Sequence, residues 1–153
     1  MTGSKGGLYR RIPDLTRVWR EHLEGGASPG RGPAGLDPGE MRSVAGRVRE
    51  LSRGLTRDRG LAGERYFSEP SLLGAYLLYY WPVSYAQCRI LLGMLPGSFS
   101  SALDLGSGPG PFSLALLDHG VRRVTALDRS RESLALARRI AELSGRSLLV
   151  REW

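Results

Sequence analysis

One strand, turn and helix unit in the last third of this chain constrains its fold more than any other feature. Ser101-Ala-Leu-Asp-Leu105 is a short apolar run, typical of a buried strand, and the glycine-rich run Gly106-Ser-Gly-Pro-Gly110 follows it directly. A helical run over 112–118 then leads to a second apolar run, 121–127, which ends at Asp128. This order is typical of a parallel α/β sheet, in which a ligand crevice lies at the turn after the first strand.

The remaining C-terminal residues continue the same alternation. Apolar residues recur at helical spacing over 131–143, Gly145 closes that helix, and Ser147–Trp153 predicts a third strand. Strand, helix, strand, helix, strand is the first half of a Rossmann-like doubly wound parallel sheet. We therefore expect an α/β fold in which residues 99–153 form a partial nucleotide-binding domain.

The N-terminal residues predict helices instead. Pro13 can begin a helix in an N-terminal helical segment, 1–24. Residues 25–40 form a linker in which nine of sixteen residues are glycine or proline. At the end of this linker, Asp37 and Glu40 have the spacing of a capping box around Pro38. This pattern predicts the start of a helical region over 41–98.

A long uncharged stretch, 71–88, raises the question of a membrane span. Because it contains Pro82, Ser84 and Gln87, two short buried helices that break at the proline explain it better. We expect no membrane partner. The basic N-terminus lacks the apolar run of a secretory signal, so we expect a cytoplasmic protein.

The glycine turn predicts a cofactor site. Glycine lets a ligand lie directly against the backbone and tolerates the unusual φ angles of such a turn, and Asp128 is placed to accept hydrogen bonds from ribose hydroxyls. Asp104 precedes the first glycine by two residues. The predicted cofactor-binding set is Asp104, Gly106, Ser107, Gly108, Gly110, Asp128 and Arg129.

Three interpretations of this turn remain open: a nicotinamide dinucleotide site, a turn that binds nothing, and a site for a cationic cofactor. The dinucleotide fingerprint is G-x-G-x-x-G, whereas this turn is G-x-G-x-G and follows Asp104, an acid that would repel a pyrophosphate but could hold an ammonium. The pattern resembles motif I of class I S-adenosylmethionine-dependent methyltransferases. That resemblance implies S-adenosylmethionine as cofactor, with Asp104 near the methionine ammonium, the glycines against the cofactor and Asp128 at the ribose.

A second resemblance concerns the helical region just before this motif. Tyr76-Leu77, Pro82-Val-Ser84-Tyr85-Ala86 and the Asp104 motif together resemble the methyltransferase-like proteins of small-ribosomal-subunit assembly in mitochondria, and their bacterial relatives. Tyr80, Val83 and Ser84 stand where that family commonly has arginine, alanine and threonine. The likeness covers residues 60–145 and implies methyl transfer to ribosomal RNA or a role in small-subunit assembly.

The composition agrees with an anionic partner and excludes several other classes. The formal charge is +7 with a pI near 10.3. Arg42, Arg47, Arg49 and Arg53 share a face of one predicted helix, which favours a solvated face, with a surface for ribosomal RNA as the alternative. The single cysteine, Cys88, excludes an internal disulfide and the cysteine cluster of that family, so no metal site is expected. His22 and His119 are far apart in the sequence and are flanked by no ligand set. Ser107 and Ser113 lack a His/Asp constellation, which argues against either as a nucleophile and against hydrolase chemistry.

The sequence does not identify a catalytic residue. The methyltransferase sheet has seven strands, and the loops that bind the methyl acceptor follow strands later than the third. We therefore expect the chain to represent an N-terminal portion of such an enzyme, with unknown catalytic residues and unknown oligomeric state. A non-catalytic RNA-binding assembly factor and a small-molecule methyltransferase are the alternative hypotheses.

Overall fold

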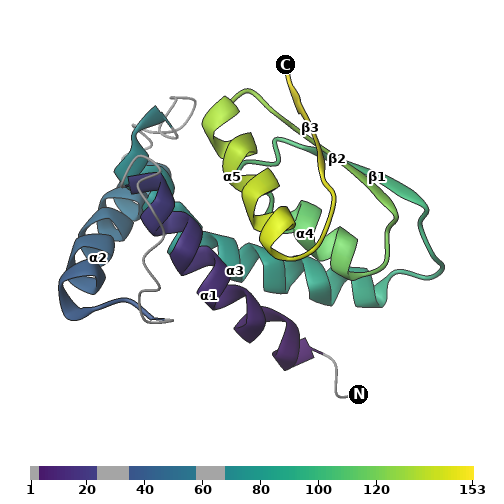
Figure 1. Cartoon of the computed structure of the whole chain (residues 1–153), viewed down its shortest axis with the longest axis horizontal. Coiled ribbons are helices and arrows are strands. Elements are labelled where there is room, and N and C mark those ends of the chain that lie inside the picture. Colours follow the sequence, from purple (N-terminus) through teal and green to yellow (C-terminus); the bar gives the residue numbers. More distant parts are fainter. Residues whose placement is uncertain (1–3, 24–34, 58–67) are drawn as a thin grey trace.

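A computed structural model describes residues 4–23, 35–57 and 68–153 (Figure 1). The sheet consists of three parallel strands in the order β1-β2-β3. Their bounds are β1 Ser101–Leu105, β2 Arg123–Asp128 and β3 Leu149–Glu152. Helix α4 (Pro111–Asp118) connects β1 to β2, and helix α5 (Arg131–Leu143) connects β2 to β3. The predicted α/β architecture with a helical N-terminal region is confirmed.

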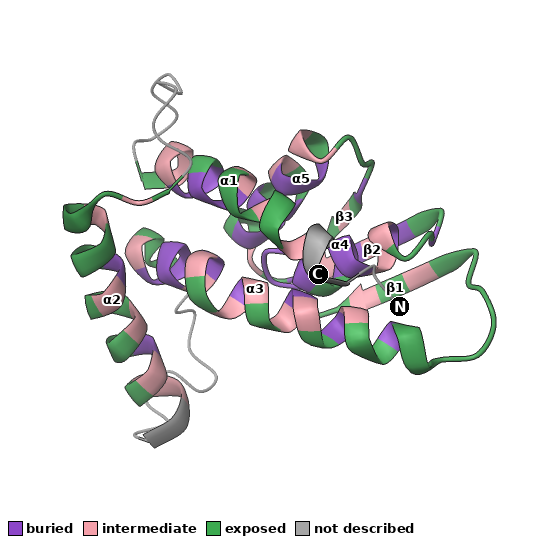
Figure 2. Ribbon diagram, turned by 90° about the horizontal axis from the view of Figure 1, so that it is seen from below, coloured by how far each residue is buried: buried purple, intermediate pink, exposed green. Residues whose placement is uncertain are grey.

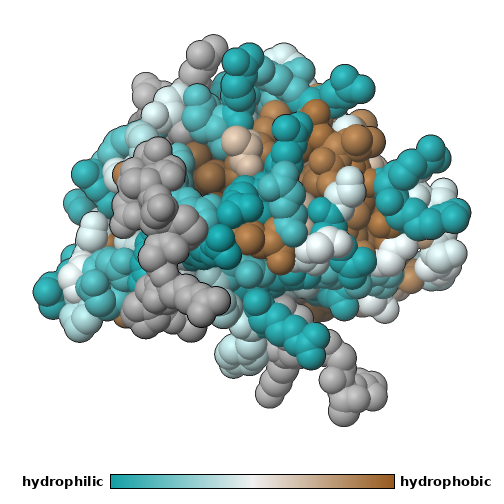
Figure 3. Space-filling model, viewed as in Figure 1, coloured by the Kyte–Doolittle hydropathy of each residue, from teal (hydrophilic) through white to brown (hydrophobic). Residues whose placement is uncertain are grey.

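The two faces of the sheet differ in what covers them. Side chains alternate along each strand, and Val124 and Ala126 are buried on the face that α4 and α5 cover. On the opposite face, Leu103, Leu105 and Leu149 are each more than half exposed. A continuous hydrophobic area lies over the strands in Figure 3. Within the described residues, the helices therefore cover one face of the sheet only.

Three α-helices precede the sheet in the described part of the chain, and the capping box predicted for one of them is present. Helix α2 (Pro38–Ser52) begins where Asp37 accepts the N–H groups of Gly39 and Glu40, while the Glu40 carboxylate accepts the Asp37 N–H at 2.8 Å. A π-helical turn, Arg53–Arg57, extends this helix. Most of the predicted glycine and proline linker (residues 25–34) lies outside the described residues.

Helix α1 (Ser4–Leu23) corrects the prediction that Pro13 opens a helix, because Pro13 lies in its interior. An internal proline costs one backbone hydrogen bond and a steric clash. Packing offsets this cost on both sides of Pro13: Leu15 is fully buried after it, while Leu8 packs against the core before it. Arg11 also forms an ion pair with Asp118 of α4.

Helix α3 (Pro70–Met94) corrects the prediction of two helices broken at Pro82. Buried side chains recur along its whole length (Figure 2), and Trp81 and Tyr85 are almost fully buried on either side of the proline. This continuous burial compensates the hydrogen bond that Pro82 cannot donate. Among the described helices, none combines the length and the apolar character that crossing a bilayer would require.

The helical and sheet regions share one hydrophobic core. Its largest cluster extends from Leu15 of α1 through Trp81 of α3 to Leu114 of α4 and Ile140 of α5. Cys88 is buried in this cluster, as expected of a small hydrophobic residue. Because α3 packs on α4 and α1 packs on α5, the helices before the sheet support the segment that follows β1.

Candidate cofactor site

The glycine turn between β1 and α4 depends on left-handed backbone at three positions. Gly106, Gly108 and Gly110 have φ angles of 67°, 52° and 72°. Residues with a Cβ rarely adopt this region, so alternate glycines in the sequence correspond to alternate left-handed residues in the turn. The chain thereby passes from β1 into α4 within five residues.

The backbone N–H groups of this turn are all used inside the protein. Gly106 and Ser107 donate to the Leu127 carbonyl at 2.8 and 3.1 Å, and Gly110 donates to the Ser107 carbonyl at 3.0 Å. Gly108 donates to the Asp128 carboxylate at 2.8 Å, and Pro109 has no N–H. The turn from Gly106 to Gly110 therefore offers no unpaired N–H to a phosphate.

Asp128 lies at the end of β2, where it was predicted, and holds two segments together. Its Oδ2 accepts the N–H of Gly108, and its Oδ1 accepts the N–H of Ser130, which starts α5, at 2.8 Å. The side chain is buried, with 7% of its surface exposed. Because a carboxylate oxygen can accept more than one hydrogen bond, Asp128 can organise the turn and still accept a hydroxyl.

The Asp104 side chain extends from β1 to the N-terminal turn of α4. Its carboxylate accepts hydrogen bonds from the Ser113 hydroxyl, at 2.7 Å, and from the Ser113 backbone N–H in the first turn of α4. Burial raises the pKa of Asp104, and the nearby charge of Asp128 raises it further against the lowering effect of Ser113. The site thus contains two acids in close range and an α4 N-terminus that a side-chain anion already occupies.

The glycines of the turn differ in what surrounds them. A Cβ at Gly106 would meet no heavy atom within 4 Å, so open space lies beside this exposed residue. A Cβ at Gly110 would lie 2.8 Å from the Cβ of Ala137 in α5. Gly106 therefore leaves room that a ligand could fill, whereas Gly110 is required by the close packing of the turn on α5.

The structure also places residues of α3 beside the site. Tyr76 is largely buried, and burial raises the pKa of its hydroxyl. A hydrogen bond with Ser84 lowers this pKa, while the charges of Asp104 and Asp128 raise it. The Trp81 indole donates to the Pro109 carbonyl at 2.9 Å. Sequence analysis included Tyr76 in the family likeness but assigned neither residue to the site. Both precede the turn by many residues on a separate helix, and the sequence does not show which way their side chains point.

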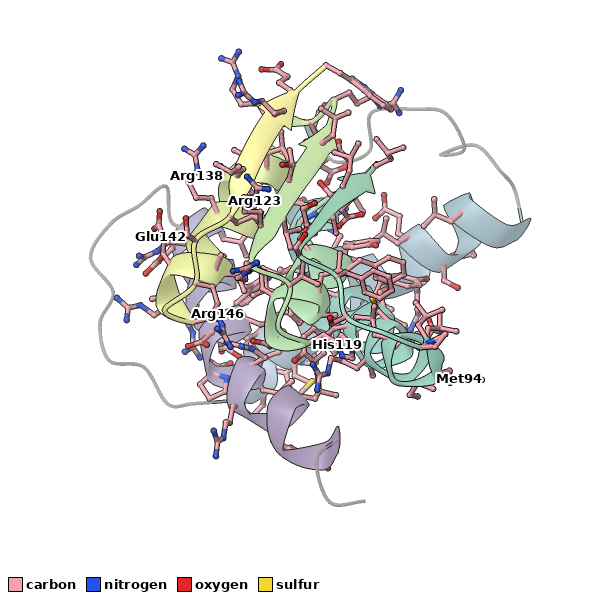
Figure 4. The ribbon with its side chains drawn as sticks, turned by 90° about the vertical axis from the view of Figure 1, so that its right-hand side faces the viewer. Met94, His119, Arg123, Arg138, Glu142 and Arg146 are labelled. Carbon is pink, nitrogen blue, oxygen red and sulfur yellow. The ribbon has the colours of Figure 1, made fainter. Side chains whose placement is uncertain are left out.

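The remaining predicted residues have clear positions. Ser107 is buried within the turn, and Arg129 is exposed immediately after Asp128. Ser113, which the sequence excluded as a nucleophile, serves as the partner of Asp104. His119 and Arg146 lie at the opposite end of the sheet from the turn, as Figure 4 shows.

The basic face of α2 forms a separate surface. Arg47 pairs with Glu50 at 2.8 Å and with Glu69 at 3.5 Å. Arg42, Arg49 and Arg53 are exposed, and within the described residues they enter no ion pair. Three of the four arginines predicted to share this face thus have guanidinium groups in solvent.

Comparisons of this chain with protein-family models, with curated proteins and with solved structures found no match.

Proposed function

We propose that the turn between β1 and α4 binds S-adenosylmethionine and that the protein functions as an S-adenosylmethionine-dependent methyltransferase. The observation that carries this proposal is the position of Asp104 at the α4 N-terminus. A dinucleotide needs that helix end and the turn N–H groups for its pyrophosphate. Here an acid occupies the helix end and the N–H groups are already paired, which favours a cationic ligand.

The residues present fit this cofactor chemically. Asp104 and Asp128 supply negative charge for an ammonium and acceptors for ribose hydroxyls, and the open space beside Gly106 admits a ligand against the backbone. When bound, S-adenosylmethionine supplies a methyl group on a sulfonium that is itself the leaving group. The contribution of this chain is to bind the cofactor, orient it and exclude water on the α3 side.

We propose ribosomal RNA, or a ribonucleoprotein of small-subunit assembly, as the partner. The exposed side chains of Arg42, Arg49 and Arg53 support an RNA partner, because arginine contacts phosphate oxygens in a bidentate manner. The same surface supports the second candidate function, a non-catalytic assembly factor that binds RNA. A small-molecule methyltransferase is the third, and transfer of a labelled methyl group to small-subunit RNA separates the first from both others.

Calorimetry with S-adenosylmethionine and with NAD tests the cofactor assignment. We expect binding of the first and none of the second. Gly106→Ala should weaken binding at least tenfold, because its Cβ enters the open space beside the turn. Gly145→Ala is the matched control: its φ of 64° nearly equals the 67° of Gly106, and its Cβ also meets nothing within 4 Å.

Because the two variants carry the same backbone strain, a loss of binding in both would indicate destabilisation rather than contact with the ligand. Binding of NAD with equal or higher affinity, or no binding of S-adenosylmethionine by the unaltered protein, would overturn the assignment.

A further inference from the structure

Trp81 connects α3, the longest of the described helices, to the glycine turn. Its side chain is fully buried, and its indole N–H donates to the Pro109 carbonyl across 28 residues of sequence at 2.9 Å. Pro109 is the one residue of the turn that cannot donate a backbone hydrogen bond. The Pro109 carbonyl connects the turn to α3, while the Gly108 N–H connects it to Asp128 of β2.

A second layer of contacts fixes Trp81 itself. The ring of Tyr85 stacks on the indole with centroids 5.2 Å apart and an interplanar angle of 8°. The Tyr85 hydroxyl donates to Asp118 Oδ2 at 2.7 Å, and Arg11 donates to both oxygens of Asp118 at 2.6 and 2.8 Å. Helices α1, α3 and α4 thus meet behind the indole, which leaves it little freedom to turn.

We propose that Trp81 is a positioning residue for the turn from Gly106 to Gly110 and thereby sets the affinity of the cofactor site. Three residues of this turn are left-handed glycines, which lose more conformational entropy on folding than other residues. Anchoring the Pro109 carbonyl limits the conformations that the turn samples before a ligand arrives. The effect on affinity depends on the proposed function, whereas the effect on the turn does not.

The test compares Trp81→Phe with Trp19→Phe by amide hydrogen exchange and by calorimetry. Both tryptophans are buried, but Trp81 of α3 donates to Pro109 in the turn, whereas Trp19 of α1 packs against Gly74 of α3. Trp81→Phe leaves the buried Pro109 carbonyl without its partner, and we expect exchange at the Gly108 and Gly110 amides to be about tenfold faster. Affinity for S-adenosylmethionine should fall by a similar factor. Trp19→Phe should leave this affinity unchanged, and exchange at Gly108 and Gly110 should change no more than exchange at the other amides.

Unchanged exchange at these two amides in Trp81→Phe, or an equal acceleration at every amide, would overturn the positioning role. If S-adenosylmethionine does not bind the unaltered protein, the proposed function fails, and the exchange comparison still decides the role of Trp81. If Trp81→Phe does not fold, the unaltered protein decides it. Its Trp81 indole N–H should exchange at the same rate as the Gly108 and Gly110 amides, and a rapidly exchanging indole beside protected amides would contradict the proposal.

Discussion

The glycine turn and the arginine face of α2 are both candidate binding surfaces, and they are built in opposite ways. In the turn, the backbone N–H groups are paired and Trp81 donates to the Pro109 carbonyl. Asp104 and Asp128 both accept hydrogen bonds from neighbouring residues. On α2, Arg42, Arg49 and Arg53 extend into solvent. The preorganised turn suits one small ligand of defined shape. The exposed arginines suit a polyanion, whose phosphates they can contact in many side-chain conformations.

The largest effect should come from Gly110→Ala, which breaks the turn at its packing contact. The new Cβ would lie 2.8 Å from the Ala137 Cβ and would also place a residue with a side chain at φ 72°. Strain and overpacking together should cost about 2–5 kcal/mol of the free energy of unfolding. Chemical denaturation measures it, with Gly120→Ala as control, since that position has positive φ but open space.

The control should cost about 1–3 kcal/mol, from backbone strain alone. Equal destabilisation by both substitutions would show that Gly110 does not pack closely on α5.

Asp104→Asn should separate binding from stability. We expect affinity for S-adenosylmethionine to fall by about 1–3 kcal/mol, the value of a charge-assisted hydrogen bond. The free energy of unfolding should instead increase at neutral pH. The pKa of Asp104 is raised in the folded protein, mainly by burial, so its ionised form costs folding free energy that protonation removes.

The melting temperature of Asp104→Asn should therefore exceed that of the unaltered protein at neutral pH, and the difference should shrink as pH falls through the raised pKa. A variant that is less stable at neutral pH would mean that the hydrogen bonds from Ser113 outweigh burial.

The exposed sheet face predicts self-association. Leu103, Leu105 and Leu149 are 59%, 64% and 56% exposed on one face of the sheet. The outer edge of β1 pairs with no strand of the described residues, and such edges template pairing with other chains. Sedimentation velocity should detect oligomers that the double variant Leu103→Lys, Leu105→Lys reduces several-fold. Ile90→Lys on α3, where 60% of the side chain is exposed, is the control. A strictly monomeric protein at high concentration would contradict this prediction.

The smallest effect should come from the arginine face. Changing Arg42, Arg49 and Arg53 together to glutamine removes three charges and keeps helix propensity. If these residues contact phosphates, the log-log salt slope of binding to small-subunit RNA should become shallower by about 2 to 3, since each contact contributes about 0.7–0.9. Arg122, Arg123 and Arg138, exposed elsewhere, provide a control variant with the same loss of charge. Equal slopes for both variants would indicate a solvated face.

The parts of the fold that sequence predicted best are those with local causes. The capping box of Asp37 and Glu40 is present as predicted, and α5 has the bounds 131–143 that its apolar spacing indicated. Each depends on residues within a few positions of one another.

The two wrong predictions concern prolines, and tertiary contacts explain both. Pro13 and Pro82 are helix-breaking signals in sequence, yet burial on both sides keeps each helix continuous. Tertiary contacts also determine the parts of the site that the sequence did not predict. Alternating glycines indicated the turn, but Ser113 as partner of Asp104 and Trp81 as partner of Pro109 depend on how α4 and α3 pack, which no local pattern records.

The most direct test of the central claim, that this turn is built for a cationic cofactor, is a titration of isotope-labelled protein followed by amide chemical shifts. S-adenosylmethionine should shift the signals of Gly106, Gly108 and Asp128 in a saturable manner, and NAD at the same concentrations should leave them unchanged. Shifts of these signals with NAD or inorganic phosphate, and none with S-adenosylmethionine, would contradict the claim that Asp104 reserves the α4 N-terminus against phosphate.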